Sequence, residues 1–172
     1  PVIDNFGLKV IDQFADPVRL PDSTVYTIDT FRLQTSDKTP MSQIVEKADL
    51  LAEGIEAVFS NKMTTDSLNH LVLQAGLSWQ AVDLMRALFG YARQLGFPYT
   101  LDQLQALFLS NIDALMSLWK FFESKFNPDL KGDRNKAIQS AKEHTTELIR
   151  AINNQDQDLA FRTFFNLIDS IL

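Results

Sequence analysis

The pattern of hydrophobic and polar positions changes once along the chain, close to residue 38. The first 35 residues are rich in β-branched and aromatic residues, in short runs broken by Pro-containing turns, which is typical of strands. Two such runs, residues 8–14 and 25–33, predict a β-hairpin. The bend between them is assigned to Pro17, Pro21, Asp22 and Ser23. A two-stranded hairpin alone in water is only marginally stable, so we expect it to pair with further strands or to lie against helices.

From Thr39 onward the apolar residues recur at helical spacing. Thr39 can cap a first amphipathic helix over residues 40–59. A short helix follows and ends at Gly76, which can adopt the left-handed conformation of a C-cap. Ser78 then caps a helix over residues 79–95 that is apolar on most sides. We therefore expect this helix to be the central one of a bundle.

Four further helices are predicted in the second half of the chain. Residues 100–103 match a capping box, and Asn111 can cap a helix that runs from Ile112 to the break at residues 127–129. A polar helix with one narrow apolar stripe covers residues 134–152, and a helix with a broad apolar face covers residues 159–172. The side chains of the 112–126 helix that we expect to point inward are Leu115, Leu118, Trp119, Phe122 and Phe126.

These elements predict a mainly α-helical fold, a multi-helix bundle preceded by a β-hairpin. Two domains are expected: the hairpin in residues 1–38 and a helical module in residues 39–172. The chain opens on proline, which either removal of a start methionine or excision from a longer protein would explain. The incomplete hairpin and the apolar residue at the end of the chain favour a segment of a longer protein.

The composition is that of a packed globule, because 45% of the residues are hydrophobic and only 22% are charged. The chain has no cysteine, which fits a cytoplasmic protein and excludes disulfides and thiolate chemistry. No apolar run reaches the roughly 18 residues that a membrane-spanning helix needs. The net charge is -6, so nucleic acid is an improbable partner, since phosphate binding depends on clustered Lys and Arg.

The motifs of common catalytic sites are missing from the sequence. The six glycines form neither a Walker loop nor a dinucleotide fingerprint, and no Gly-x-Ser-x-Gly elbow occurs. His144 and Glu147 lie three positions apart on one predicted helix and could share a metal, but only His70 remains as a further histidine. A surface histidine explains His144 better. We assign no catalytic, cofactor-binding or metal-ligating residue to the chain.

Residues 71–79 also suggest a helix-turn-helix, because a helix, a turn containing glycine and a second helix follow one another. The second helix argues against DNA binding. Its cations are Arg86 and Arg93, too few for a phosphate backbone, and most of its surface is apolar. A tight corner in a helical bundle accounts for the same residues.

Residues 71–93 carry a characteristic series of short motifs: Ala75-Gly76-Leu77-Ser78-Trp79, Val82, Leu84, Arg86-Ala87 and Tyr91-Ala92-Arg93. With these motifs the segment resembles a region of the large bacterial NAD-dependent glutamate dehydrogenases. Four other pieces follow the order of that family: residues 5–12, 96–100, 121–129 and 164–168. The resemblance covers nearly the whole chain but a small part of the family's length.

The resemblance implies a place between the last ACT-like regulatory domain and the dehydrogenase domain of such an enzyme. The hairpin would be the remnant of an ACT-like sheet, and the residues that bind substrate and NAD would lie beyond Leu172. The parent enzyme would oxidise L-glutamate to 2-oxoglutarate and ammonium with NAD as the hydride acceptor. The segment itself would hold no cofactor; its partners would be the other domains and subunits of a homo-oligomeric, cytoplasmic enzyme.

Two alternatives from other classes stay open at this point. A free-standing helical adaptor would bind a partner helix in an apolar groove, for example one lined by the last helix. A sensor inherited from the ACT-like portion would bind a small ligand, and a thermal shift with amino acids would reveal it.

Overall fold

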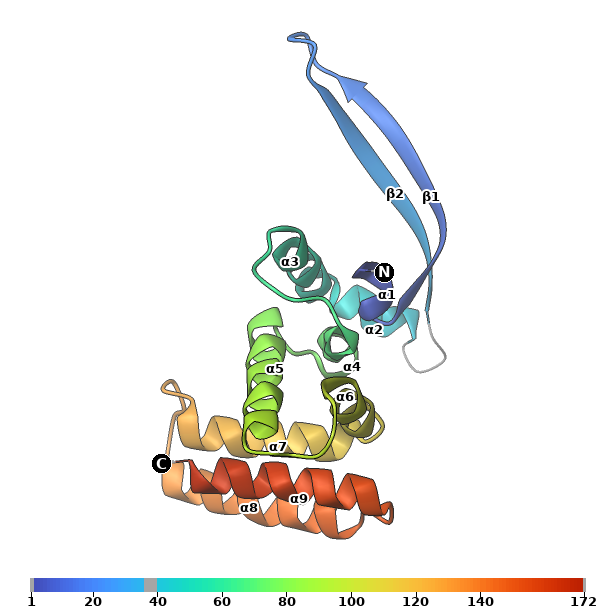
Figure 1. Ribbon diagram of the computed structural model, residues 1–172. Helices are drawn as coiled ribbons and strands as arrows, with labels where there is room; N and C mark the ends of the chain where they lie inside the picture. The colour runs from blue at the N-terminus through green and yellow to red at the C-terminus, as the bar shows by residue number, and fades with distance from the viewer. Residues whose placement is uncertain (1, 36–39, 172) are drawn as a thin grey trace. The chain divides into compact units, whose positions relative to one another are not determined.

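The computed structural model describes residues 2–35 and 40–171 and is mainly α-helical, with an antiparallel hairpin near its N-terminus, which confirms the predicted fold class (Figure 1). The chain divides into two compact units, Pro1–Asp83 and Leu84–Leu172. The boundary between these units falls within helix α5 (Trp79–Gln94). The predicted domain boundary at residues 38 and 39 lies outside the described residues and stays a prediction.

Strands β1 (Leu8–Arg19) and β2 (Val25–Thr35) form the hairpin and are longer than the sequence predicted. The prediction that Pro17 belongs to the bend is wrong, because Pro17 lies within β1, opposite Thr27. The turn is made instead by residues 20–24: the Leu20 amide donates to the Thr24 carbonyl at 2.8 Å, and Ser23 has a φ of 71°. A register irregularity between Val10 and Asp12 marks a β-bulge in β1.

The helices of the first unit are short. They are α1 (Val2–Asn5), α2 (Met41–Glu46), α3 (Ala48–Phe59), the 3₁₀ helix η1 (Ser67–Asn69) and α4 (His70–Ala75). The single helix predicted for residues 40–59 is interrupted at Lys47, which has a φ of -107°. The Lys47 ammonium donates to the Leu73 carbonyl at 2.6 Å, so this side chain satisfies a free carbonyl at the end of α4. The predicted cap Thr39 lies outside the described residues.

The core of the first unit surrounds α4 and the beginning of the hairpin. Its fully buried large side chains are Phe6, Leu8, Leu68, Leu71, Val72 and Leu73. Gly76 ends α4 in the left-handed conformation, with a φ of 68°, and the Leu77 amide donates to the Leu71 carbonyl at 3.3 Å. These bonds form the glycine C-cap that the sequence predicts.

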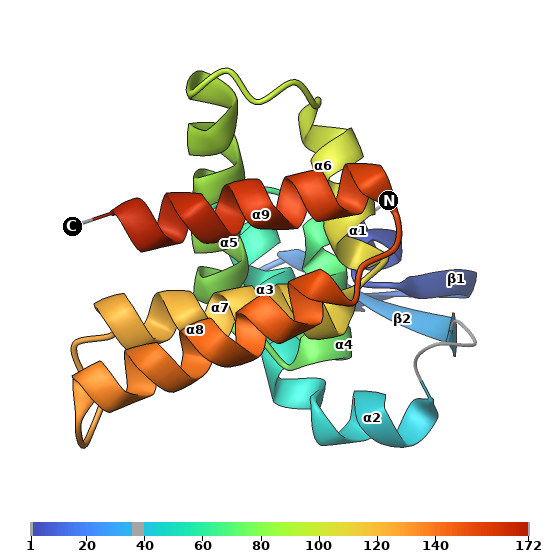
Figure 2. The same ribbon diagram turned by 90° about the horizontal axis from the view of Figure 1, so that it is seen from below.

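The second unit contains the remainder of α5 together with α6 (Leu101–Leu109), α7 (Ile112–Phe126), α8 (Arg134–Arg150) and α9 (Gln155–Ser170). Helices α7 and α8 lie side by side, and α9 contacts α6, α7 and α8 (Figure 2). The capping box at Thr100 and the cap at Asn111 are confirmed. Helix α9 begins at Gln155 rather than Leu159, because the Asn154 side chain accepts a hydrogen bond from the Gln157 amide at 2.9 Å.

An aromatic cluster forms the core of the second unit. The ring centroid of Phe108 lies 4.9 Å from that of Phe89, 4.6 Å from that of Phe161 and 4.7 Å from that of Phe164. All four rings are buried. Such ring pairs add to the stabilisation that comes from the burial of apolar area.

Helices α5 and α7 orient their apolar residues differently from the prediction. In α7, Leu115, Leu118 and Trp119 are buried as predicted. Phe121, which was not among the predicted residues, is also buried and stacks on Phe165 at 5.3 Å, whereas Phe122 and Phe126 are only half-buried.

The prediction that α5 is a central helix, buried on most sides, is wrong, because the large apolar side chains of Leu84 and Tyr91 are exposed. Helix α5 buries one face, formed by Val82, Met85, Phe89 and Ala92. Leu84, Tyr91 and Leu95 are exposed. No helix in the described part of the chain is both long and apolar enough to span a bilayer.

Candidate functional site

The two residues considered as a metal pair, His144 and Glu147, are both exposed on α8. Within residues 2–35 and 40–171, no three His, Cys, Asp or Glu side chains are grouped so that they could hold a metal ion. His144 therefore has the surroundings of an ordinary surface histidine.

The corner that suggested a helix-turn-helix consists of α4, Gly76 and α5. Helix α4 has six residues, of which Leu71, Val72 and Leu73 are buried in the core. The corner is thus explained by packing and by the glycine C-cap.

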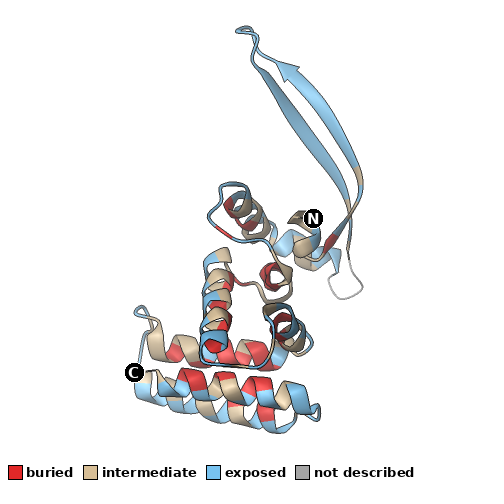
Figure 3. Cartoon of the chain, viewed as in Figure 1, coloured by how far each residue is buried: buried red, intermediate tan, exposed pale blue. Residues whose placement is uncertain are grey.

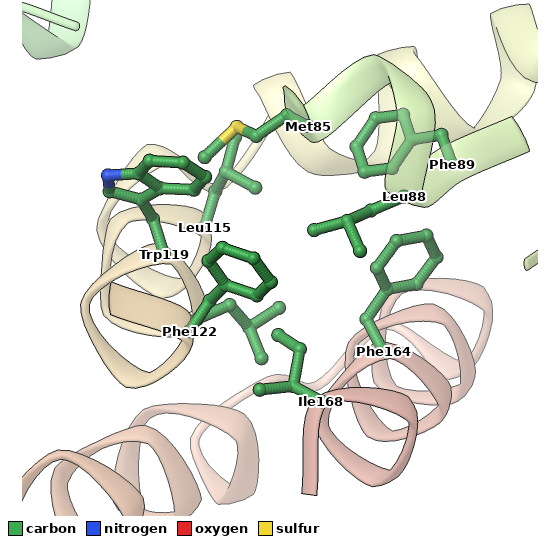
Figure 4. Close-up of a pocket in the computed structure, with 9 residues that line it drawn as sticks. Met85, Leu88, Phe89, Leu115, Trp119, Phe122, Phe164 and Ile168 are labelled. Carbon is green, nitrogen blue, oxygen red and sulfur yellow. The ribbon is translucent and has the colours of Figure 1, made fainter. Parts of the chain in front are cut away.

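A small apolar cavity opens between α5, α7 and α9 of the second unit (Figure 4). Its volume is about 20 Å³, far below the roughly 300 Å³ of small-molecule sites. The side chains that line it are Met85, Leu88, Phe89, Leu115, Leu118, Trp119, Phe122, Phe164 and Ile168. Because none of them carries a charge, the cavity is a gap in the apolar core that would be expected to stay dry.

A polar depression of about 480 Å³ lies at the base of the hairpin in the first unit. It is lined by Asp4, Gly7, Leu8, Lys9, Gln34, Thr35 and His70. The Nδ1 atom of His70 is 2.8 Å from the Ser67 carbonyl, which can only accept, so Nδ1 carries the proton. Gly7 lets the imidazole approach closely: a Cβ on Gly7 would lie 2.9 Å from Cδ2 of the ring. In the neutral imidazole Nε2 is then the acceptor nitrogen.

The sequence did not predict the depression, since it suggested no role for His70 other than that of a metal ligand. The residues that line it come from four separate places in the chain. The one local signal is Gly7, a glycine just before a predicted strand. It has a φ of 85°, a conformation that favours glycine.

The hairpin is exposed along most of its length (Figure 3), and one of its faces carries several large apolar side chains. Residues directly opposite each other in an antiparallel pair share a face, so the register places Phe14, Val18, Tyr26 and Ile28 together. Their exposed fractions are 57%, 40%, 58% and 57%. An ion pair between Asp12 and Arg32 borders this apolar hairpin face.

The opposite face of the hairpin mixes polar and apolar residues, and the exposed side chains of Val25 and Phe31 lie on it. Gln13 donates to the Asp29 carboxylate at 2.9 Å across the strands, and Thr27 and Arg19 lie on the same side. Large exposed apolar side chains therefore lie on both faces, and the first face carries more of them.

Comparison with known proteins gives one consistent relationship. Residues 63–128 match the family described as "Glutamate dehydrogenase, helical motif 3". The whole chain aligns with the NAD-specific glutamate dehydrogenase of Mycobacterium tuberculosis at 29% identity. It also aligns over its full length with the NAD-specific glutamate dehydrogenases of Halomonas elongata and Pseudomonas aeruginosa, each at 24% identity.

The chain spans only about a tenth of the length of these relatives, between 10% and 11%. The resemblance seen in the sequence is confirmed: the chain is similar to one segment of the large NAD-specific glutamate dehydrogenases.

Proposed function

We propose, from its match to a segment of the NAD-specific glutamate dehydrogenases, that this chain is a non-catalytic structural and regulatory part of such an enzyme. The parent reaction would convert L-glutamate, NAD and water to 2-oxoglutarate, ammonium and NADH. The observation that carries the proposal is that all 172 residues of the chain align with three proteins named NAD-specific glutamate dehydrogenase. The parent enzyme would bind NAD outside this segment.

The exposed hairpin supports a role in joining domains. Its apolar face carries four large side chains that are exposed to solvent. Contact with another domain would bury them, which is favourable for apolar groups. We assign the hairpin, residues 1–38, to the end of an ACT-like domain and residues 39–172 to a helical module. Its partners would be the other domains and subunits of a homo-oligomeric enzyme in the cytoplasm, a location that the absence of cysteine fits.

The test compares the 172-residue chain with the full-length protein that contains it. We expect glutamate-dependent NADH formation, followed at 340 nm, from the full-length protein and none from the 172-residue chain. Calorimetric titration of the short chain with NAD should give no heat of binding. Turnover by the short chain, or a full-length protein without glutamate-dependent activity, would contradict the proposal.

One observation favours the adaptor as a second candidate. Leu84 and Tyr91 are exposed on one side of α5, and exposed Leu95 follows its last residue, as in a helix-binding face. Under this alternative the chain would co-purify at fixed stoichiometry with an unrelated protein. Replacement of Tyr91 by serine would abolish that association, whereas replacement of exposed Gln94 would leave it unchanged.

The polar depression at His70 is the observation that favours a small-ligand sensor. An amino acid bound there should raise the melting temperature, because a ligand that binds only the folded chain stabilises it. The variant His70→Ala should remove that increase. Absence of a shift with all common amino acids would leave the depression without a role in sensing them.

A further inference from the structure

The two outer edges of the hairpin differ in their ability to pair with another strand. In an antiparallel ladder the backbone groups of successive residues point alternately toward the partner strand and away from it. The Leu20 amide donates to Thr24 of the other strand. Counted along the register from this bond, every second pair of residues is hydrogen-bonded across the hairpin. Thr27, Asp29 and Phe31 belong to the pairs in between, so their amides and carbonyls point outward from β2.

The outer edge of β2 is an uninterrupted template for a strand. Its eleven residues contain neither proline nor glycine, and most of them are exposed. β-branched and aromatic residues, which favour strands, dominate its sequence. Long exposed edges of this kind are rare in isolated proteins, because they pair readily with other chains.

The outer edge of β1 is interrupted at two places. Pro17 is one of the outward-pointing residues by the same alternation, so this edge lacks a donor where Pro17 stands. The bulge between Val10 and Asp12 bends the strand and disturbs the spacing of its backbone groups. Both features are known devices that prevent strand addition.

We propose that the outer edge of β2 pairs with an additional β-strand supplied by the part of the full-length protein that lies outside residues 1–172. This inference rests on the proposed function and specifies which surface of the segment joins the rest of the enzyme. About nine tenths of the length of the relatives lies outside the matched segment, so such a polypeptide offers ample sequence for this strand. The new strand would extend the sheet to three strands, the number at which a sheet becomes independently stable.

The apolar hairpin face favours this occupant over a second copy of the chain. Symmetric pairing of two β2 edges would join two hairpins but leave Phe14, Tyr26 and Ile28 exposed in both copies. A strand that belongs to a neighbouring domain can bring a covering layer with it. Burial of these side chains then contributes to the association along with the backbone hydrogen bonds.

Hydrogen–deuterium exchange followed by mass spectrometry tests the proposal. The peptide that contains β2 should exchange at least about tenfold more slowly in the full-length protein than in the 172-residue chain, because pairing protects the outward amides. Equal exchange of this peptide in the two proteins would overturn the proposal. A dimer of the 172-residue chain with a protected β2 peptide would identify a second copy as the occupant and would also overturn it.

A matched pair of proline variants tests which outer edge of the hairpin, that of β1 or that of β2, pairs with the additional strand. Ala15 and Asp29 lie opposite each other and both point their amides outward, so Ala15→Pro and Asp29→Pro each remove one outward donor and no backbone hydrogen bond within the hairpin. In the full-length protein Asp29→Pro should restore fast exchange of the β2 peptide, and Ala15→Pro should not. Equal effects of the two variants, or a larger effect of Ala15→Pro, would refute the assignment to β2.

The variant Asp29→Ala distinguishes the effect of losing the backbone amide from the effect of losing the carboxylate, which accepts a hydrogen bond from Gln13. This variant keeps the outward donor and should leave the slow exchange intact. The assay for glutamate oxidation is independent of exchange. An inactive full-length protein whose β2 is protected would contradict the proposed function alone, whereas an active protein with an unprotected β2 would contradict the strand pairing alone.

Discussion

The aromatic ring of Phe6 lies directly against the α-carbon of Gly54 on helix α3, where a Cβ would come within 2.8 Å of Cε1 of the ring. The residue at position 54 therefore determines whether the N-terminal segment can pack on α3. Phe6 is fully buried, so its ring has little freedom to move aside.

The substitution Gly54→Ala should destabilise the protein by about 1–2 kcal/mol, because the cost of overpacking exceeds the gain in helix propensity of about 1 kcal/mol. The matched control is Gly90→Ala on α5, where an added Cβ meets no atom within 4 Å. That variant should stabilise the protein by about 0.5–1 kcal/mol. Urea unfolding measures both. Stabilisation by Gly54→Ala would show that the Phe6 ring moves freely.

Lys125 on α7 should contribute measurably to stability, because its ammonium donates to three carbonyls at the end of α9. The distances are 2.8 Å to Ile168, 2.9 Å to Asp169 and 2.8 Å to Ile171. The substitution Lys125→Met should cost about 1–2 kcal/mol through the loss of these bonds and of the charge at the helix C-terminus.

The control for Lys125 is Lys120→Met on the same helix, an exposed position that should change stability by less than about 0.5 kcal/mol. Thermal unfolding in 0.1 M and 1 M salt distinguishes the two sites. Equal losses at both positions would exclude the helix-capping role of Lys125.

The hydroxyl groups of Ser117 on α7 and Thr145 on α8 form a buried hydrogen bond of 2.8 Å. Each single substitution, Ser117→Ala or Thr145→Val, should destabilise the protein by about 1–3 kcal/mol, since it removes one partner of a buried polar pair. The double variant should lose less than the sum of the two single variants, because the hydrogen bond between the two hydroxyls can be lost only once. A strictly additive double-mutant cycle would disprove the coupling.

The pKa of the Tyr99 phenol should lie above its usual value, because its hydroxyl donates a hydrogen bond of 2.8 Å to the Asp156 carboxylate and the nearby negative charge disfavours phenolate. Tyr99 should therefore ionise above about pH 10 in the folded protein. The difference in absorbance at 295 nm between the wild type and Tyr99→Phe isolates its titration.

Because the folded-state pKa of Tyr99 is the higher one, the stability due to this bond is complete below the unfolded-state pKa and is lost as the pH rises through the folded-state pKa. The variant Asp156→Asn removes the charge and should shift the midpoint back toward the ordinary value. An unchanged midpoint in that variant would rule out Asp156 as the cause.

Local signals in the sequence predicted the helix ends well. A glycine at position 76 and the Thr100 capping box each act through neighbouring residues, so their geometry follows from a few adjacent positions. The Asn154 cap is equally local, and its omission delayed the predicted start of α9 by four residues.

Features that depend on distant residues were not predictable in this way. Lys47 and Arg134 satisfy carbonyls at the ends of α4 and α7, which the spacing of apolar residues does not reveal. Pro17 is tolerated in a strand because its nitrogen faces the outer edge of β1, where no hydrogen bond to β2 is lost. The hydrogen bonds of the turn set this orientation. The apolar face of the hairpin could be identified only from the register of its two strands.

The interruption of β1 at Pro17 has a consequence for how far such a sheet can grow. A strand with two open edges can be joined on both sides and so propagate into a fibril. Here copies of the chain can pair only through β2, so two paired hairpins would each turn an interrupted β1 edge outward and could not grow further. The missing amide of a single proline thus favours a closed complex over a polymer.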